Sequence, residues 1–145
     1  MITLMRHMIT YLSFNGNCRE AMLFYQDCLG GEISFQTIGE TPVAHKLPAC
    51  IQHFILNATL TKDDWILMGT DMVADEGLIR GNTVSILLEC RNEEEMRRCY
   101  KKLSAGGART QEIERTYWGA LFGGLTDRYG NHWLLKSTDY ELVPW

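Results

Sequence analysis

Four histidines are the residues best suited to metal binding or acid–base chemistry: His7, His45, His53 and His132. Imidazole nitrogens bind divalent metals and titrate near neutral pH, so a functional set would have to bring several of them together. No two of these histidines have the helical or strand spacing that places two ligands on one ion. Cys50 and His53 fail as a pair as well, because positions three apart in an extended segment point to opposite faces. The chain therefore carries no metal motif that is local in sequence.

A glycine-rich aromatic segment, residues 116–124, is the second candidate for chemistry. Large side chains alternate with three glycines, a composition typical of a strand that bends and allows close approach of another backbone. Two interpretations stay open, and they do not exclude each other. The segment is a core strand at a bend of a sheet, or it is the apolar wall of a cleft that holds a small molecule through Trp118 and Phe122.

Several reaction classes lack their motifs. The chain has no glycine-rich phosphate loop, no GxSxG elbow and no HExxH pair, so nucleotide hydrolysis, serine-hydrolase and zinc-protease chemistry have no support. The net charge of -4 argues against a nucleic-acid partner or an anionic membrane surface. No apolar run approaches the roughly 20 residues that span a bilayer.

The cysteine pattern indicates a reducing compartment. Five cysteines are an odd number, and none of them forms a CxxC pair, which fits a reduced protein better than a disulfide framework. Residues 1–10 lack a signal-peptide core followed by a small-residue cleavage site. We therefore expect a soluble, cytoplasmic protein.

The elements that must position these candidates occur in two copies. Residues 65–71 (WILMGTD) are echoed by residues 133–139 (WLLKSTD), with four identical positions in seven at a separation of 68. A second echo, from Asn17 to Gly30-Gly31 and from Asn92 to Gly106-Gly107, is separated by 75. The first copy must therefore hold about seven additional residues, which we place in a loop at residues 39–49. Two copies of one supersecondary unit predict a pseudo-twofold domain with a cavity lined by matching positions.

Each copy is predicted to be β-α-β-β-β. Asn17 and Asn92 are the expected helix N-caps, each with a glutamate three residues later, and glycine pairs end both helices. The helices carry apolar stripes at residues 21, 24, 25 and 28 and at residues 96, 99, 100 and 103. The predicted strands are 8–15, 32–38, 50–57 and 64–70, with a turn at 61–63, and then 83–90, 108–114, 117–126 and 132–138. The expected fold class is α+β, in one domain of residues 1–145 made of repeat 1 (about 8–71) and repeat 2 (about 82–139).

Blocks along nearly the whole chain resemble the PhnB-like branch of the glyoxalase/bleomycin-resistance/extradiol-dioxygenase superfamily. They are residues 11–21 (YLSFNGNCREA), Phe24-Tyr25, 29–33, 67–71, Trp118-Gly119, Phe122-Gly123, 125–127 and 130–133. The resemblance implies the glyoxalase-like (vicinal oxygen chelate) fold, in which two tandem βαβββ modules form curved mixed sheets around a cleft. Members commonly hold a divalent metal and a small substrate there, and homodimers are usual.

The resemblance also identifies where metal ligands would stand. Catalytic members commonly place His or Glu on the first and last strands of the modules. The matching positions here are Thr10 or Tyr11, Ser85 or Ile86, Ile66, and Leu134, and strand alternation favours Tyr11 facing the cleft. None of these residues is an imidazole or a carboxylate, so the resemblance predicts a cleft without the usual metal and without a cofactor.

Two functions follow as hypotheses, and whether the protein is an enzyme is left open. The first is a metal-free, small-molecule-binding protein whose ligand cleft is lined by Tyr11, His53, Trp118, Phe122 and Leu134. The alternative is a metal-dependent lyase, isomerase or dioxygenase that uses a shifted ligand set of His53, Glu89 and His132. A methyltransferase is disfavoured, because no cofactor-binding glycine loop follows a strand. A homodimer is expected from the resemblance.

Overall fold

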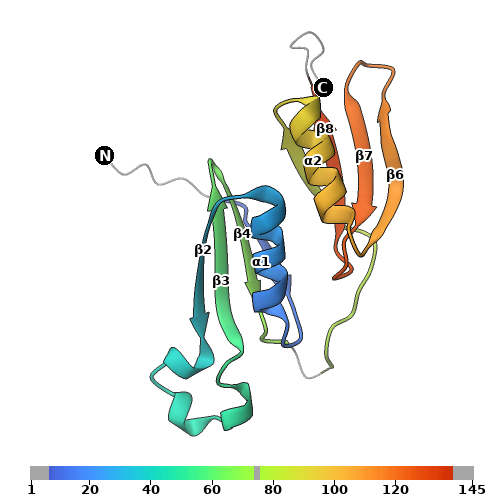
Figure 1. Ribbon diagram of the computed structural model, residues 1–145. Helices are drawn as coiled ribbons and strands as arrows, with labels where there is room; N and C mark the ends of the chain where they lie inside the picture. The colour runs from blue at the N-terminus through green and yellow to red at the C-terminus, as the bar shows by residue number, and fades with distance from the viewer. Residues whose placement is uncertain (1–6, 74–75, 139–145) are drawn as a thin grey trace. The chain divides into compact units, whose positions relative to one another are not determined.

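The computed structural model describes residues 7–73 and 76–138 and divides the chain into two compact units, residues 1–79 and 80–145 (Figure 1). Each unit is one βαβββ module, and each contains one of the two predicted repeats. The α+β fold class is confirmed. That the two modules form one domain stays a prediction.

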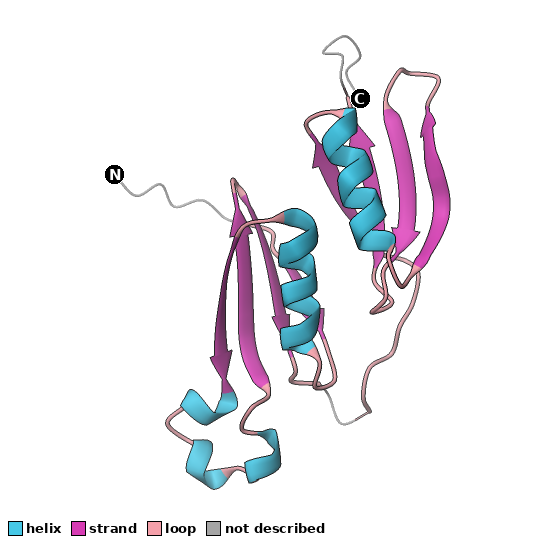
Figure 2. Cartoon of the chain, in the orientation of Figure 1, coloured by secondary structure: helices cyan, strands magenta, loops and turns pink. Residues whose placement is uncertain are grey.

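The first unit is a four-stranded sheet with one α-helix and three short 3-10 helices. Its elements are β1 (Thr10–Ser13), α1 (Cys18–Leu29), β2 (Glu32–Thr37), η1 (Ile38–Glu40), η2 (Ala44–Lys46), η3 (Ala49–Ile51), β3 (Ile55–Lys62) and β4 (Trp65–Thr70). The strand order is β1-β4-β3-β2. The first and last strands pair in parallel, and the remaining pairs are antiparallel (Figure 2).

The second unit repeats this topology without the 3-10 helices. Its elements are β5 (Ile86–Cys90), α2 (Glu93–Ser104), β6 (Ala108–Arg115), β7 (Leu121–Thr126) and β8 (His132–Ser137), in the sheet order β5-β8-β7-β6. Strands β5 and β8 are the parallel pair. The predicted order of elements is therefore confirmed in both repeats, and the additional residues of the first repeat form the 3-10 segment between β2 and β3.

Each helix packs on one face of its own sheet. A Cβ atom placed on Gly69 of β4 would lie 3.1 Å from both Cys18 Sγ and Met22 Sδ of α1, so this face of β4 contacts the helix closely. In α2 the predicted stripe of residues 96, 99, 100 and 103 is buried throughout, and Trp133 and Leu135 of β8 are buried as well. Burying each large apolar side chain contributes about 1.5–3 kcal/mol, which makes these helix–sheet layers the cores of the two units.

In each unit one buried aspartate accepts several hydrogen bonds. Asp71, which follows β4, accepts hydrogen bonds from the backbone N–H groups of Gly16 and Cys18 (both 2.9 Å) and of Ile55 (2.8 Å). In the second unit Asp127 accepts from Tyr129 N, Asn131 N and Trp133 Nε1. Both side chains satisfy donors that are otherwise expensive to bury.

Both predicted N-cap positions are confirmed, but only one of the two asparagines caps its helix through the side chain. Asn92 caps α2 as expected, since its Oδ1 accepts from Glu95 N at 2.8 Å. Asn17 precedes α1 but makes no side-chain cap bond, because its backbone (φ -112°, ψ 22°) lacks the extended conformation that aims the side chain at the first turn. The Asp71 carboxylate bonds the first-turn N–H of Cys18 in its place.

Several strand boundaries are also corrected. β1 begins at Thr10 rather than at residue 8, β5 begins at Ile86 rather than at 83, and β7 begins at Leu121 rather than at 117. The predicted strand 50–57 is largely wrong, because residues 38–54 fold on themselves through bonds from Gly39 N to Gln52 O (2.7 Å) and from Ile38 N to Phe54 O (3.0 Å). The β3–β4 turn lies at Asp63-Asp64 instead of 61–63, and Asp63 adopts a positive φ of 53°. In the described ranges no helix is long and apolar enough to cross a membrane.

Two matched substitutions test the caps. Asn92→Ala should lower the free energy of unfolding by about 1 kcal/mol, because the Glu95 N–H loses its acceptor. Asn17→Ala should change it by less than about 0.5 kcal/mol, because no side-chain cap bond is lost. Urea-induced unfolding followed by circular dichroism measures both changes. Equal losses in the two variants would contradict this assignment of the caps.

The carboxylate of Asp71 can be tested in the same assay. Asp71→Ala should cost about 3–5 kcal/mol, because three backbone donors lose their acceptor and two of these hydrogen bonds are buried. Asp64→Ala, which removes the same group from the exposed β3–β4 turn, is the control and should stay within about 0.5 kcal/mol of the wild type. A loss of unfolding free energy below 1 kcal/mol in Asp71→Ala would contradict the conclusion that this carboxylate stabilises the unit.

Candidate functional site

Each sheet has a second face, whose residues alternate with those that face the helix; we call it the open face. The strand register identifies its members. In the first unit Tyr11, Met68 and Thr59 form one row across β1, β4 and β3. In the second unit the matching row is Glu89, Lys136 and Phe122 across β5, β8 and β7. The open faces therefore bring residues from both ends of each module side by side.

The open face of the first unit is mainly polar. Besides Tyr11, which is 54% exposed, and Met68, it carries hydroxyl and amide side chains at Ser13, Ser34, Asn57, Thr59 and Thr61. Asn57 Oδ1 is buried and has no hydrogen-bond partner among the residues that the structure describes. A buried acceptor of this kind needs a donor from elsewhere, since leaving it unsatisfied costs about 1–3 kcal/mol.

The open face of the second unit is apolar at its centre. Leu87 of β5 lies opposite Leu134 of β8, and Leu87 is 52% exposed. Gly124 of β7 pairs with Leu134, and a Cβ there would come within 3.1 Å of Leu134 Cδ2, so the glycine makes room for the leucine. Phe122 is on the same face two residues before Gly124 and is half-buried. We call Leu87, Phe122 and Leu134 the apolar cluster.

A buried lysine adjoins the apolar cluster. Lys136 is only 7% exposed, and its Nζ lies 3.1 Å from Glu89 Oε2, whose side chain is 70% exposed. The sequence-based prediction missed Lys136 as a site residue. The signal was present in the repeat, because WLLKSTD places lysine where WILMGTD has Met68.

Three of the five predicted ligand residues lie on open faces: Tyr11 in the first unit, and Phe122 and Leu134 in the second. The structure also changes the expected counterparts on the first strands. Ser85 precedes β5, and Ile86 pairs with Trp133 on the helix-facing side. The residue of the second unit that matches Tyr11 is Glu89, a carboxylate.

His53 is not in the middle of a strand as predicted. It lies in the turn before β3, is exposed, and has its ring edge-on to Phe54 with centroids 5.1 Å apart. His53 lies outside the strand because hydrogen bonds between the two ends of residues 38–54 form a closed loop. Strand β3 therefore begins only at Ile55. As a ligand residue His53 stays a prediction, now from a loop.

Trp118 is likewise outside its predicted strand. The segment between β6 and β7 turns at residues 116–120, where Thr116 N donates to Ala120 O (2.7 Å) and Gly119 N donates to Thr116 O (3.0 Å). Gly119 supports this turn with a φ of 93°, a conformation that other residues rarely adopt. Trp118 is half-buried, with its ring edge-on to the exposed ring of Tyr117. The interpretation of residues 117–120 as strand is wrong, because the turn satisfies their backbone groups locally.

The alternative metal ligands are divided between the units. His53 belongs to the first unit, and Glu89 and His132 stand on the open face of the second. Both ring nitrogens of His132 have partners, with Nδ1 2.8 Å from Thr126 Oγ1 and Nε2 2.9 Å from Gly81 O. Since a carbonyl accepts only, Nε2 donates to Gly81 O. Within residues 7–73 and 76–138, no three His, Cys, Asp or Glu side chains form a group that could hold an ion.

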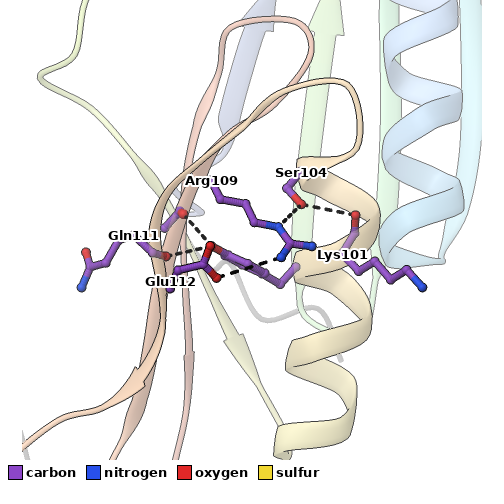
Figure 3. Close-up of polar contacts among 7 residues, drawn as sticks. Lys101, Ser104, Arg109, Gln111 and Glu112 are labelled. Atoms are coloured by element: carbon purple, nitrogen blue, oxygen red, sulfur yellow. Dashed lines mark hydrogen bonds and ion pairs between the residues drawn. The ribbon is translucent and has the colours of Figure 1, made fainter.

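A cavity of about 240 Å³ lies elsewhere, between α2 and β6, and is lined by Arg97, Tyr100, Lys101, Arg109, Glu112 and Ile113. Figure 3 shows Arg109 reaching from β6 to Ser104 of α2, with Nε 3.3 Å from Ser104 Oγ. Its guanidinium lies 5.1 Å from the centroid of the Tyr100 ring. Burial, and then the charge of Glu112, raises the pKa of Tyr100, so its hydroxyl stays protonated and donates to Gln111 O. These contacts join α2 to the sheet, away from the open face.

Two of the buried cysteines, Cys18 and Cys90, are poor nucleophiles. Burial, reinforced by the nearby Asp71 carboxylate, raises the pKa of Cys18 to about 12. A hydrogen bond between the Cys90 and Cys99 thiols, together with burial, raises the pKa of Cys90. Because the thiolate is the reactive form, these side chains act as core residues rather than as reaction centres.

Comparison with known families gives a match over most of the chain. Residues 6–136 match the family described as 3-demethylubiquinone-9 3-methyltransferase. The chain is similar to protein PA1353 from Pseudomonas aeruginosa, with 32% identity, a TM-score of 0.80, and coverage of 92% of this chain and 98% of that one.

Two further solved structures are similar to this chain in fold. A putative 3-demethylubiquinone-9 3-methyltransferase, PhnB protein, from Bacillus cereus is 26% identical with a TM-score of 0.74, covering 92% of this chain and all (100%) of that one. A glyoxalase/bleomycin resistance protein/dioxygenase family enzyme from Burkholderia phytofirmans PsJN has a TM-score of 0.59 at 13% identity, over 89% and 97% of the two chains. The second likeness concerns the fold alone, and it identifies the glyoxalase-like fold.

Metal analysis tests the shifted ligand set. Freshly purified protein should contain well below one equivalent of zinc, nickel, iron or manganese per chain, because Glu89 is paired with Lys136 and both nitrogens of His132 are engaged. Inductively coupled plasma mass spectrometry gives the metal content. A full equivalent that disappears in both Glu89→Gln and His132→Ala would establish the alternative site instead.

Proposed function

Because the chain belongs to the PhnB-like 3-demethylubiquinone-9 3-methyltransferase family within the glyoxalase/bleomycin-resistance/dioxygenase superfamily, we propose that it binds a small molecule on the open faces of its sheets. The proposed binding requires neither the usual metal of the superfamily nor another cofactor. We also propose a homodimer, as superfamily members commonly form.

The main support for the proposed binding is the apolar cluster. Leu87, Phe122 and Leu134 stand together on a face that the helix of their own unit does not cover, while α2 buries the other face. Exposed apolar residues that gather on one surface commonly mark a binding site, since covering them removes apolar area from water. Ligand sites typically combine such a surface with a few polar groups that orient the ligand.

The open face of the first unit is polar and is considered by itself. The Tyr11 hydroxyl can donate or accept a hydrogen bond, and Asn57 Oδ1 is a buried acceptor without a partner in the described ranges. A ligand that contacts the first open face would therefore be bound by hydrogen bonds more than by apolar contact.

A metal-dependent lyase, isomerase or dioxygenase is the second candidate, and Glu89 is the observation that favours it. Glu89 is the carboxylate at the position matching Tyr11, on a first strand of a module, where superfamily enzymes often carry a ligand. Leu134 and Ile66, at the corresponding places on the last strands, have no donor atoms. The methyltransferase named in the family description is not proposed, because no cofactor-binding glycine loop follows a strand in this chain.

A neutral fluorescent ligand tests the proposed site. N-phenyl-1-naphthylamine should bind the wild-type protein, and Leu87→Ala should weaken its binding about five- to tenfold, because a leucine side chain in contact contributes roughly 1–1.5 kcal/mol. Fluorescence titration measures the dissociation constants.

The matched control is Leu23→Ala, which removes the same side chain from an exposed position of α1. This variant should bind the ligand as the wild type does. Equal effects of the two substitutions would place binding outside the open face, and absence of binding by the wild type would overturn the proposed function for apolar ligands of this size.

A further inference from the structure

Lys136 has an unusual environment for a lysine. It stands on the open face of β8, between Glu89 of β5 and Phe122 of β7 in the sheet register, and is 7% exposed. Lysine is rarely buried to this extent, because removing an ammonium group from water costs several kcal/mol unless a partner offsets the loss. Its presence on this face therefore calls for a reason other than packing.

The ion pair with Glu89 is asymmetric. The ammonium is buried, whereas the Glu89 side chain that meets it at 3.1 Å is 70% exposed. An exposed carboxylate can rotate into solvent at little cost, since it regains full hydration there. Another anion could then occupy its place beside Lys136 without a change in the backbone.

The first unit shows that the fold does not need this charge. Met68 occupies the matching position of β4, where it pairs with Tyr11 and Thr59. Lysine and methionine have unbranched stems of similar length, so the same backbone accommodates an apolar residue. The charge is specific to the second unit, next to the apolar cluster.

We propose that Lys136 is a specificity-determining residue that binds an oxyanion of the ligand, such as a carboxylate or sulfonate, while the apolar cluster holds its apolar body. This inference rests on the proposed function, because it names the chemical class of the molecule bound at the same face. The oxyanion replaces the Glu89 carboxylate at the ammonium, and Glu89 moves into solvent. A charge-assisted hydrogen bond of this kind favours anionic over neutral ligands of the same shape.

Two fluorescent compounds with a common N-phenylnaphthylamine body test the proposal: neutral N-phenyl-1-naphthylamine and anionic 1-anilinonaphthalene-8-sulfonate. The measured quantity is the ratio of the two dissociation constants, neutral over anionic, for each variant. Lys136→Met, which installs the residue of the first unit, should lower this ratio roughly tenfold. Lys136→Arg should retain most of it, and Glu89→Gln should raise it about threefold, because the competing charge is removed.

The control for net charge is Lys102→Met, on the exposed surface of α2 in the same unit. It changes the total charge equally and should leave the ratio unchanged. Circular dichroism establishes that each variant is folded. If Lys136→Met does not fold, Glu89→Gln still tests the proposal, since it leaves the lysine in place.

The outcomes separate the two proposals. If the wild type binds neither compound, the proposed function fails and the inference fails with it. If the neutral compound binds but the ratio is the same in Lys136→Met and Glu89→Gln as in the wild type, the inference alone is overturned. An equal fall of the ratio in Lys102→Met and Lys136→Met would assign the effect to net charge and would likewise overturn the inference.

Discussion

The parallel pairing of the first strand of each module with its last strand is the constraint on which both the cores and the open faces depend. It joins β1 to β4 and β5 to β8, segments that lie at opposite ends of each repeat. In the first unit the Asp71 carboxylate secures this closure, because it follows β4 and binds the backbone at Gly16, Cys18 and Ile55. The same pairing sets Tyr11 beside Met68 and Glu89 beside Lys136.

The two modules share a backbone plan and differ in the chemistry of their open faces. The face of the first unit carries mainly hydroxyl and amide groups around Tyr11 and Met68. The face of the second carries the apolar cluster and the Lys136–Glu89 pair. The two repeats therefore keep one backbone topology while their open faces differ in polarity.

Buried polar groups in this chain fall into two kinds. Asp71 and Asp127 accept several hydrogen bonds from the backbone or from Trp133, and these bonds hold segments of the fold together. Lys136 instead faces a carboxylate that is largely in solvent. This difference is the reason why the proposed ligand contact is placed at Lys136 and not at the two aspartates.

Local sequence determined the elements, because apolar periodicity and turn residues act over a few positions. The duplication, both helices, the stripe of α2 and the Asn92 cap were predicted correctly on that basis. Only the tertiary structure decided the features that depend on distant residues. Asp71 caps α1 from 53 positions away in sequence, the closure of residues 38–54 moves His53 out of β3, and the register of β5 on β8 pairs Glu89 with Lys136. No local pattern encodes which residue a strand meets on its neighbour, because that register is set by the packing of the whole module.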